Sequence, residues 1–126
     1  MKKIVLIVAL LVSSLFAEPK LTDMFDAYEN AKTQHKNVIV MLSMKGCPGC
    51  EYMKDIVFED KNVAKLLKNF VLVELDVHTD SIPDKLEYFA TPTFYFLDAD
   101  EKILKRLNGG ENVGKFTKTL QSMKKK

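Results

Sequence analysis

Cysteine is scarce in this sequence, because Cys47 and Cys50 are the only two among 126 residues. Two cysteines are too few for a scaffold held together by disulfides, which usually has four or more. A zinc site built from two spaced pairs of ligands is not expected either, because His35 and His78 each stand alone in the sequence. A haem attachment site is excluded because Glu51, and not histidine, follows Cys50. We therefore expect no metal and no haem.

Long hydrophobic runs are also scarce, and none after residue 17 is long enough to span a membrane. The one apolar run, Ile4–Val12, follows two lysines and precedes the segment Ser13–Ala17. This arrangement is typical of a secretory signal peptide. We expect residues 1–17 to be a signal peptide that is cleaved after Ala17, and residues 18–126 to form one exported domain. The alternative is an uncleaved membrane anchor.

An excess of charge of one sign is absent as well. The chain has 19 basic and 17 acidic residues, and two of the lysines lie in the expected signal peptide, which leaves 17 basic residues in the mature chain. A net charge of zero gives no support to nucleic-acid binding. We interpret Lys124–Lys126 as a solvated helix end, where cations are favourable.

The hydrophobic pattern predicts alternating helices and strands. An unbroken apolar run at 37–43 favours a strand that is buried on both faces of a sheet. Strands separated by helices favour parallel pairing, so the sequence predicts an α/β domain. The expected elements are a helix at 21–34 with Thr22 as its N-cap, a strand at 37–43, a helix containing Cys50, Met53 and Val57, a further helical turn or two around Val63, Leu66 and Leu67, a strand at 70–77, a short helix at 82–89, a hairpin of strands at 93–98 and 102–107, and a closing helix marked by Val113, Phe116, Leu120 and Met123.

The position of the two cysteines favours redox chemistry over a structural role. A disulfide between them would close a loop of only four residues and would remove little entropy from the unfolded chain. A strand, a turn and a helix instead place Cys47 at a helix N-terminus, where free N–H groups and the dipole stabilise a thiolate. Cys50 lies one helical turn further along, near enough to form a disulfide with Cys47. Pro48 fits the first helical turn, and Gly49 lets another backbone segment approach closely.

Two motifs carry a resemblance to a known family. C-P-G-C, at 47–50, stands between a predicted strand and a predicted helix, and Thr91-Pro92 stands directly before the apolar segment "TFYFLD". Together they resemble the thioredoxin-fold proteins over residues 21–123. The segment "CEYMKDIVFEDKNVAKLLKNFVLVELDV" is similar to exported thioredoxin-related proteins and to the C-terminal periplasmic domain of the transmembrane thiol:disulfide interchange reductases.

The resemblance implies a thioredoxin fold, with a central four-stranded mixed sheet in the order 4-3-1-2 flanked by helices, here with an extra N-terminal helix. It implies that Cys47 attacks a client disulfide and that Cys50 resolves the mixed disulfide. The backbone of Thr91 would pair with an extended client segment beside a cis Pro92, and Pro48 and Gly49 would belong to the same substrate-binding surface. An ordinary trans proline at the start of a strand is the alternative.

The sequence departs from the family pattern around the cysteines. Gly46 stands where tryptophan is usual, Pro-Gly replaces Gly-Pro between the cysteines, and Met41 stands where the family has a buried aspartate. Methionine cannot carry a proton. Glu74 is the candidate replacement, because a carboxylate buried near Cys50 can act as a proton shuttle. The alternative is a partly solvated carboxylate on an edge strand.

These features predict a thiol:disulfide oxidoreductase whose only redox group is the Cys47–Cys50 pair. We expect a monomeric periplasmic reductase of disulfides in exported proteins, and the resemblance suggests apocytochromes c among its clients. A membrane thiol reductase would resupply electrons, because the sequence shows no nucleotide site. Two alternatives stay open. One is a disulfide oxidase or isomerase, which the threonine before the proline resembles, and the other is a non-catalytic module that binds peptides.

Overall fold

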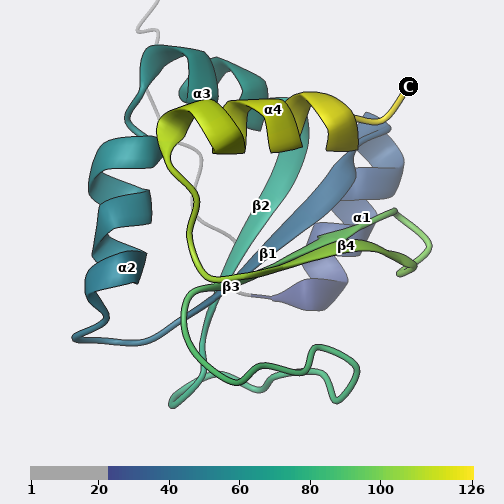
Figure 1. Cartoon of the computed structure of the whole chain (residues 1–126). Coiled ribbons are helices and arrows are strands. Elements are labelled where there is room, and N and C mark those ends of the chain that lie inside the picture. Colours follow the sequence, from purple (N-terminus) through teal and green to yellow (C-terminus); the bar gives the residue numbers. More distant parts are fainter. Residues whose placement is uncertain (1–22) are drawn as a thin grey trace, which may run out of the picture.

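Four strands form a single mixed sheet in the order β2-β1-β3-β4 (Figure 1). The computed structural model describes residues 23–126, so the expected signal peptide, its cleavage site and Thr22 lie outside the described residues. The strands are β1 (Asn37–Ser43), β2 (Phe70–Asp76), β3 (Thr93–Leu97) and β4 (Ile103–Asn108). β1 pairs in parallel with β2 and antiparallel with β3, which pairs antiparallel with β4. From β4 onward this is the order 4-3-1-2, so the predicted thioredoxin fold is confirmed. Each predicted strand is correct to within one residue at either end.

Helices cover both faces of the sheet (Figure 1). The helical elements are α1 (Met24–Gln34), α2 (Pro48–Tyr52), its π-helical continuation η1 (Met53–Val57), α3 (Lys61–Leu67) and α4 (Val113–Met123). α1 packs on one face, and the other four pack on the face that carries the cysteines. No helix among residues 23–126 has the length and hydrophobicity needed to cross a bilayer.

The first helix begins later than predicted. Its N-cap is Asp23 and not Thr22, because the Asp23 carboxylate accepts the N–H groups of Phe25 and Asp26 at 2.7 and 3.4 Å. A carboxylate at this position satisfies N–H groups that have no partner within the helix. The helix therefore starts at Met24.

β1 supplies side chains to two separate cores, because all seven of its residues are buried. Val38, Val40 and Leu42 pack with α1, whereas Ile39 and Met41 pack with the cysteine-bearing helix. Alternate side chains of a strand point to opposite faces, so a strand covered on both sides has no polar alternation. Burying each of these side chains stabilises the fold by about 1.5–3 kcal/mol. The central strand thus fixes the position from which the chain turns toward Cys47.

The short helix predicted at 82–89 is wrong. Residues 77–92 form a loop with turns, one of which is closed by the N–H of Leu86 donating to the carbonyl of Pro83 at 2.9 Å. Leu86 is buried in the core on the α1 side, whereas Phe89 is 89% exposed. A single buried side chain does not give a helix an apolar face, so the segment stays in the irregular conformation that leads to Pro92.

Candidate active site

Cys47 lies where the chain leaves β1 and enters α2. Gly46 has a φ of 72°, a conformation that residues with a side chain rarely adopt, and it turns the chain toward the helix. Cys47 is the N-cap of α2, and its Sγ accepts the N–H of Cys50 at 3.1 Å. Pro48 takes the first helical position, where an N–H would have had no helical partner. The helix start therefore directs a hydrogen-bond donor at the sulfur of Cys47.

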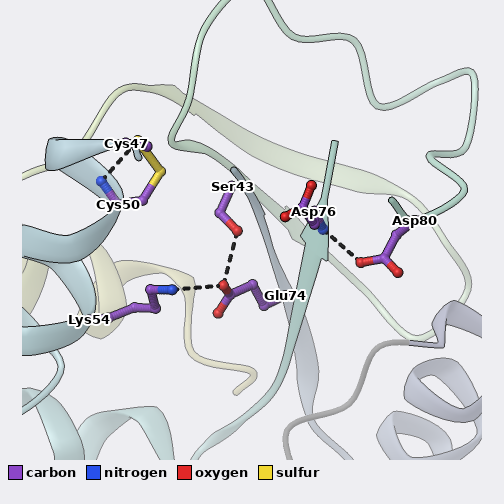
Figure 2. A network of polar contacts seen from close by, with 7 residues as sticks. All are labelled: Ser43, Cys47, Cys50, Lys54, Glu74, Asp76 and Asp80. Carbon is purple, nitrogen blue, oxygen red and sulfur yellow. Dashed lines mark hydrogen bonds and ion pairs between the residues drawn. A yellow bond between two sulfur atoms is a disulfide. The ribbon is translucent and has the colours of Figure 1, made fainter. Parts of the chain in front are cut away.

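Cys47 and Cys50 form a disulfide in this structure (Figure 2). Cys47 is 4% exposed at the helix terminus, and Cys50, one turn further along, is 1% exposed. Both sulfurs pack among apolar side chains of the core on that face of the sheet. The structure thus represents the oxidised form of the pair, with Cys47 the more accessible of the two.

Pro92 lies beside the cysteine-bearing turn. The Thr91–Pro92 peptide bond is cis, and a Cβ placed on Gly49 would lie 3.1 Å from Cδ of Pro92. The carbonyl of Pro92 accepts the N–H of Gly109 at 2.9 Å. Three segments that are far apart in the sequence therefore meet at Pro92: the start of α2, the loop before β3 and the loop after β4.

Gly110 is a site residue that the sequence reasoning missed. A Cβ on Gly110 would lie 3.0 Å from Sδ of Met53 and 3.9 Å from Cγ of Pro92. Met53 is fully buried directly after α2, so Gly110 lets the loop after β4 approach both the cysteine-bearing helix and Pro92. The signal was present as the adjacent glycines in "NGG", which the sequence analysis used only as a break between elements.

Glu74 lies on the face of the sheet that carries the cysteines. It pairs in register with Met41, and in a parallel pair such neighbours point to the same face. Its side chain is 15% exposed although β2 is an edge strand. Its Oε1 accepts the hydroxyl of Ser43 at 2.9 Å and forms an ion pair with Nζ of Lys54 at 3.1 Å. Glu74 is therefore mostly buried and charge-paired on an edge strand, and its role as a proton shuttle stays a prediction.

Figure 2 shows how this network joins the sheet to the cysteine-bearing helix. Lys54 reaches from η1 to Glu74, and Ser43 approaches the same oxygen from the end of β1. Lys54 stands four residues after Cys50, and side chains at this spacing are neighbours on a helix. The sequence analysis missed Lys54 and Ser43, although the i, i+4 spacing from Cys50 was the available signal.

The histidines lie away from this network. His35 caps the C-terminal end of α1 with a φ of 54°, and the N–H of His78 donates to the Asp76 carboxylate at 2.8 Å in the turn after β2. The backbone N–H of Asp76 in turn donates to Asp80 (Figure 2). Among residues 23–126 no three His, Cys, Asp or Glu side chains come together as metal ligands.

Comparisons with known proteins agree with this architecture. The sequence profile of the thioredoxin-like domain matches residues 24–124. A thioredoxin from Thermus thermophilus is similar in structure, with a TM-score of 0.69 and 26% identity over 82% of this chain and 85% of that chain. A putative disulphide-isomerase from Bacteroides thetaiotaomicron has a TM-score of 0.69 and 22% identity over 81% of this chain and 87% of that chain.

A third similar structure is the oxidised C-terminal domain of DsbD from Neisseria meningitidis, with a TM-score of 0.67 and 15% identity over 82% of this chain and 98% of that domain. No curated protein matches the chain by sequence. At these identities the two latter structures establish a shared fold and leave the direction of any redox reaction to be argued from the site.

Proposed function

The chain belongs to the thioredoxin-like family and is a thiol–disulfide oxidoreductase, and from this premise we propose that it reduces disulfides of exported proteins. The observation that carries the proposal is Cys47 at the N-cap of α2, with an N–H donor 3.1 Å from its sulfur and Pro92 beside it. A donor aimed at the sulfur stabilises the thiolate, which is the nucleophile in disulfide exchange, so the geometry supports attack by Cys47. The choice of reduction over oxidation rests on the resemblance to the periplasmic domain of the interchange reductases.

The reaction has two exchange steps. The Cys47 thiolate attacks one sulfur of the client disulfide, an S–S bond to Cys47 forms, and the other client sulfur leaves as a thiolate that takes up a proton. The thiol of Cys50 then loses its proton and attacks Sγ of Cys47. The Cys47–Cys50 disulfide closes, and the second client sulfur leaves. Two electrons pass from the dithiol to the client, and a dithiol of a membrane reductase would restore them.

The Lys54–Glu74 pair supports a path for the proton of Cys50. We assign Glu74 as the group that accepts this proton during resolution, either directly or through one water. Before the transfer the negative charge resides on Glu74, and after it on the Cys50 sulfur, while the ammonium of Lys54 stays in place. The ion pair with Lys54 stabilises the charged form of Glu74 that accepts the proton.

Trapping of the intermediate tests this function. In the Cys50→Ala variant the second step is blocked, so we expect a covalent complex with a disulfide-containing client such as insulin, seen by non-reducing electrophoresis. The Cys47→Ala variant is the matched control and should trap nothing. If Cys50→Ala forms no adduct, or if Cys47→Ala forms as much, the assignment of attacking and resolving cysteines fails.

Disulfide isomerisation is the second candidate, and Thr91 favours it. Its hydroxyl is buried without a hydrogen-bond partner among the described residues, next to the cis bond at Pro92. Threonine at this place also resembles disulfide isomerases of the exported compartment. Recovery of ribonuclease activity from the scrambled enzyme separates the two roles, because a reductase without isomerase activity does not restore the native disulfides.

A further inference from the structure

Three lysine-rich segments meet at the end of the sheet opposite to the active site. Asn37 begins β1 and pairs with Phe70 at the start of β2. The side-chain amide of Asn37 donates to the carbonyl of Met123 at 2.9 Å, which brings the end of α4 to the same place. In Figure 1 the C-terminus lies at the opposite end of the molecule from the loop that joins β1 to α2.

We call the lysines of these segments the basic pole. The segments are 34–37, 65–70 and 121–126, and they contain six lysines and no aspartate or glutamate. The basic pole consists of Lys36, Lys65, Lys68, Lys124, Lys125 and Lys126. All of these side chains are exposed except that of Lys36, which is half-buried.

Acidic residues also lie at this end of the sheet, in the turn between β3 and β4. Asp98 follows Leu97, which pairs with Val38, and its carboxylate accepts the N–H groups of Asp100 and Lys102 at 2.9 Å within the turn itself. Asp100 and Glu101 line a hollow beside α1. α1 packs on the opposite face of the sheet from α4, so these carboxylates face away from the lysines that follow α4.

The chemistry of the basic pole favours a delocalised anionic partner. It contains lysine and no arginine, and lysine is a strongly hydrated point charge without the planar fork that arginine uses to grip a single carboxylate or phosphate. Lys65 lies in α3, Lys36 and Lys68 follow α1 and α3, and Lys124–Lys126 follow α4. The pole is also about 20 Å from Cys47, the length of β1 at about 3.3 Å per residue. The pole is therefore separate from the active site.

We propose that the basic pole binds an anionic phospholipid surface and so holds the active-site end outward. Clustered lysines are attracted to such a surface by its negative potential, and the attraction decays within a Debye length. An enzyme held in this way would present Cys47 to proteins that approach from solution. The proposal concerns a surface that takes no part in the redox step, so it stands or falls separately from the proposed function.

Vesicle co-sedimentation of residues 18–126 tests the proposal, because this part contains every helix and strand described. We expect binding to vesicles of mixed phosphatidylglycerol and phosphatidylcholine at low salt, loss of binding at high salt, and none to pure phosphatidylcholine. The variant Lys124→Gln/Lys125→Gln/Lys126→Gln should lower the partition coefficient about 100-fold. Reduction of a soluble disulfide by this variant should be unchanged.

The matched control carries Lys45→Gln/Lys61→Gln/Lys115→Gln, three exposed lysines outside the basic pole. It removes the same charge, so it should retain most of the vesicle binding. Equal loss in both variants would overturn the proposal, because net charge alone would then explain the binding. Absence of binding to the anionic vesicles at low salt would also overturn it. So would retention on immobilised polyglutamate without vesicle binding, which would indicate an acidic protein surface as the partner.

Discussion

At the scale of single residues, the proposed path for the proton of Cys50 depends on Glu74 and Lys54. Sequence comparison with the family pattern showed that Met41 cannot transfer a proton, and it pointed to Glu74. It could not show that Lys54 and Ser43 both contact the carboxylate, because those contacts depend on how β2 aligns with β1 and on the path of η1. A charged residue on a helix near a cysteine is ordinarily solvated, so the sequence pattern alone did not indicate a role for Lys54.

Replacing Lys54 tests its part in resolution. In Lys54→Met, Glu74 loses its ion-pair partner, so its mostly buried carboxylate is less stable in the charged form that accepts the proton. We expect resolution of the mixed disulfide to slow by roughly 3–10-fold near neutral pH, because the side chain of Lys54 is 35% exposed and the pair is partly screened.

The measurement is single-turnover release of the client thiol from a preformed mixed disulfide, recorded against pH. Lys54→Arg keeps the cation and should retain the wild-type profile. Glu74→Gln removes the base and should slow resolution at least as much as Lys54→Met does. Superimposable profiles for Lys54→Met and the wild type would contradict a role for this ion pair in proton transfer.

At the scale of elements, β1 and the turn into α2 were predictable and the loop at 77–92 was not. The apolar run at 37–43 fits only a central strand of a sheet that helices cover on both faces. The local sequence and the tertiary structure therefore agree for this strand. In the loop, Ile82, Leu86 and Phe89 have the spacing that is typical of one face of a helix. Only Leu86 is fully buried, and the loop is also held by the hydroxyl of Tyr95, which donates to the carbonyl of Glu87 at 2.6 Å. These contacts and the link to Pro92 set its course.

Alanine substitution at two glycines tests the close approach at the site. Gly110→Ala places a Cβ 3.0 Å from Sδ of the buried Met53, so the packing must shift. We expect a loss of about 1–3 kcal/mol in the free energy of unfolding, measured by urea denaturation. Gly114→Ala, within helix α4, is the control. The nearest atom to its Cβ would be Asn112 Oδ1 at 3.7 Å, so the added methyl group meets no close contact. It should be stabilising by about 0.5 kcal/mol. Destabilisation of similar size in both variants would argue against a specific role of Gly110.

The free energy of unfolding should depend on pH in alkaline solution, because Tyr28 of α1 is buried against the sheet. Burial, with Glu101 and Asp98 nearby, raises the pKa of Tyr28 from 10.0 to about 12. The folded protein therefore binds the phenolic proton more tightly than the unfolded chain does. The stabilisation is complete below the unfolded pKa of 10.0 and is lost as the pH rises through about 12.

This loss should amount to about 1 kcal/mol once solvent screening of the carboxylates is allowed for. Denaturation curves measured below and above this pH range test it. The Tyr28→Phe variant has no phenolic proton, so its free energy of unfolding should lack this step. A step of equal size in the variant would assign the pH dependence to other groups.

For the whole molecule, the sequence predicted the fold through its motifs but concealed the distribution of charge. Residues 18–126, with 17 acidic and 17 basic residues, gave no reason to expect a charged surface. The lysines gather only because the start of β1, the start of β2 and the end of α4 meet at one end of the sheet. The order of the strands determines which segments meet, and the net charge of the sequence carries no information about that order.

The reduction potential of the Cys47–Cys50 pair tests the central claim most directly. It would be measured by titrating residues 18–126 against glutathione, or against dithiothreitol if glutathione leaves the pair oxidised. A reductase that delivers electrons to client disulfides should have a potential near the ~−270 mV typical of thioredoxin. A potential near the ~−120 mV of strong disulfide donors would mean that the protein oxidises its clients, and would contradict the account.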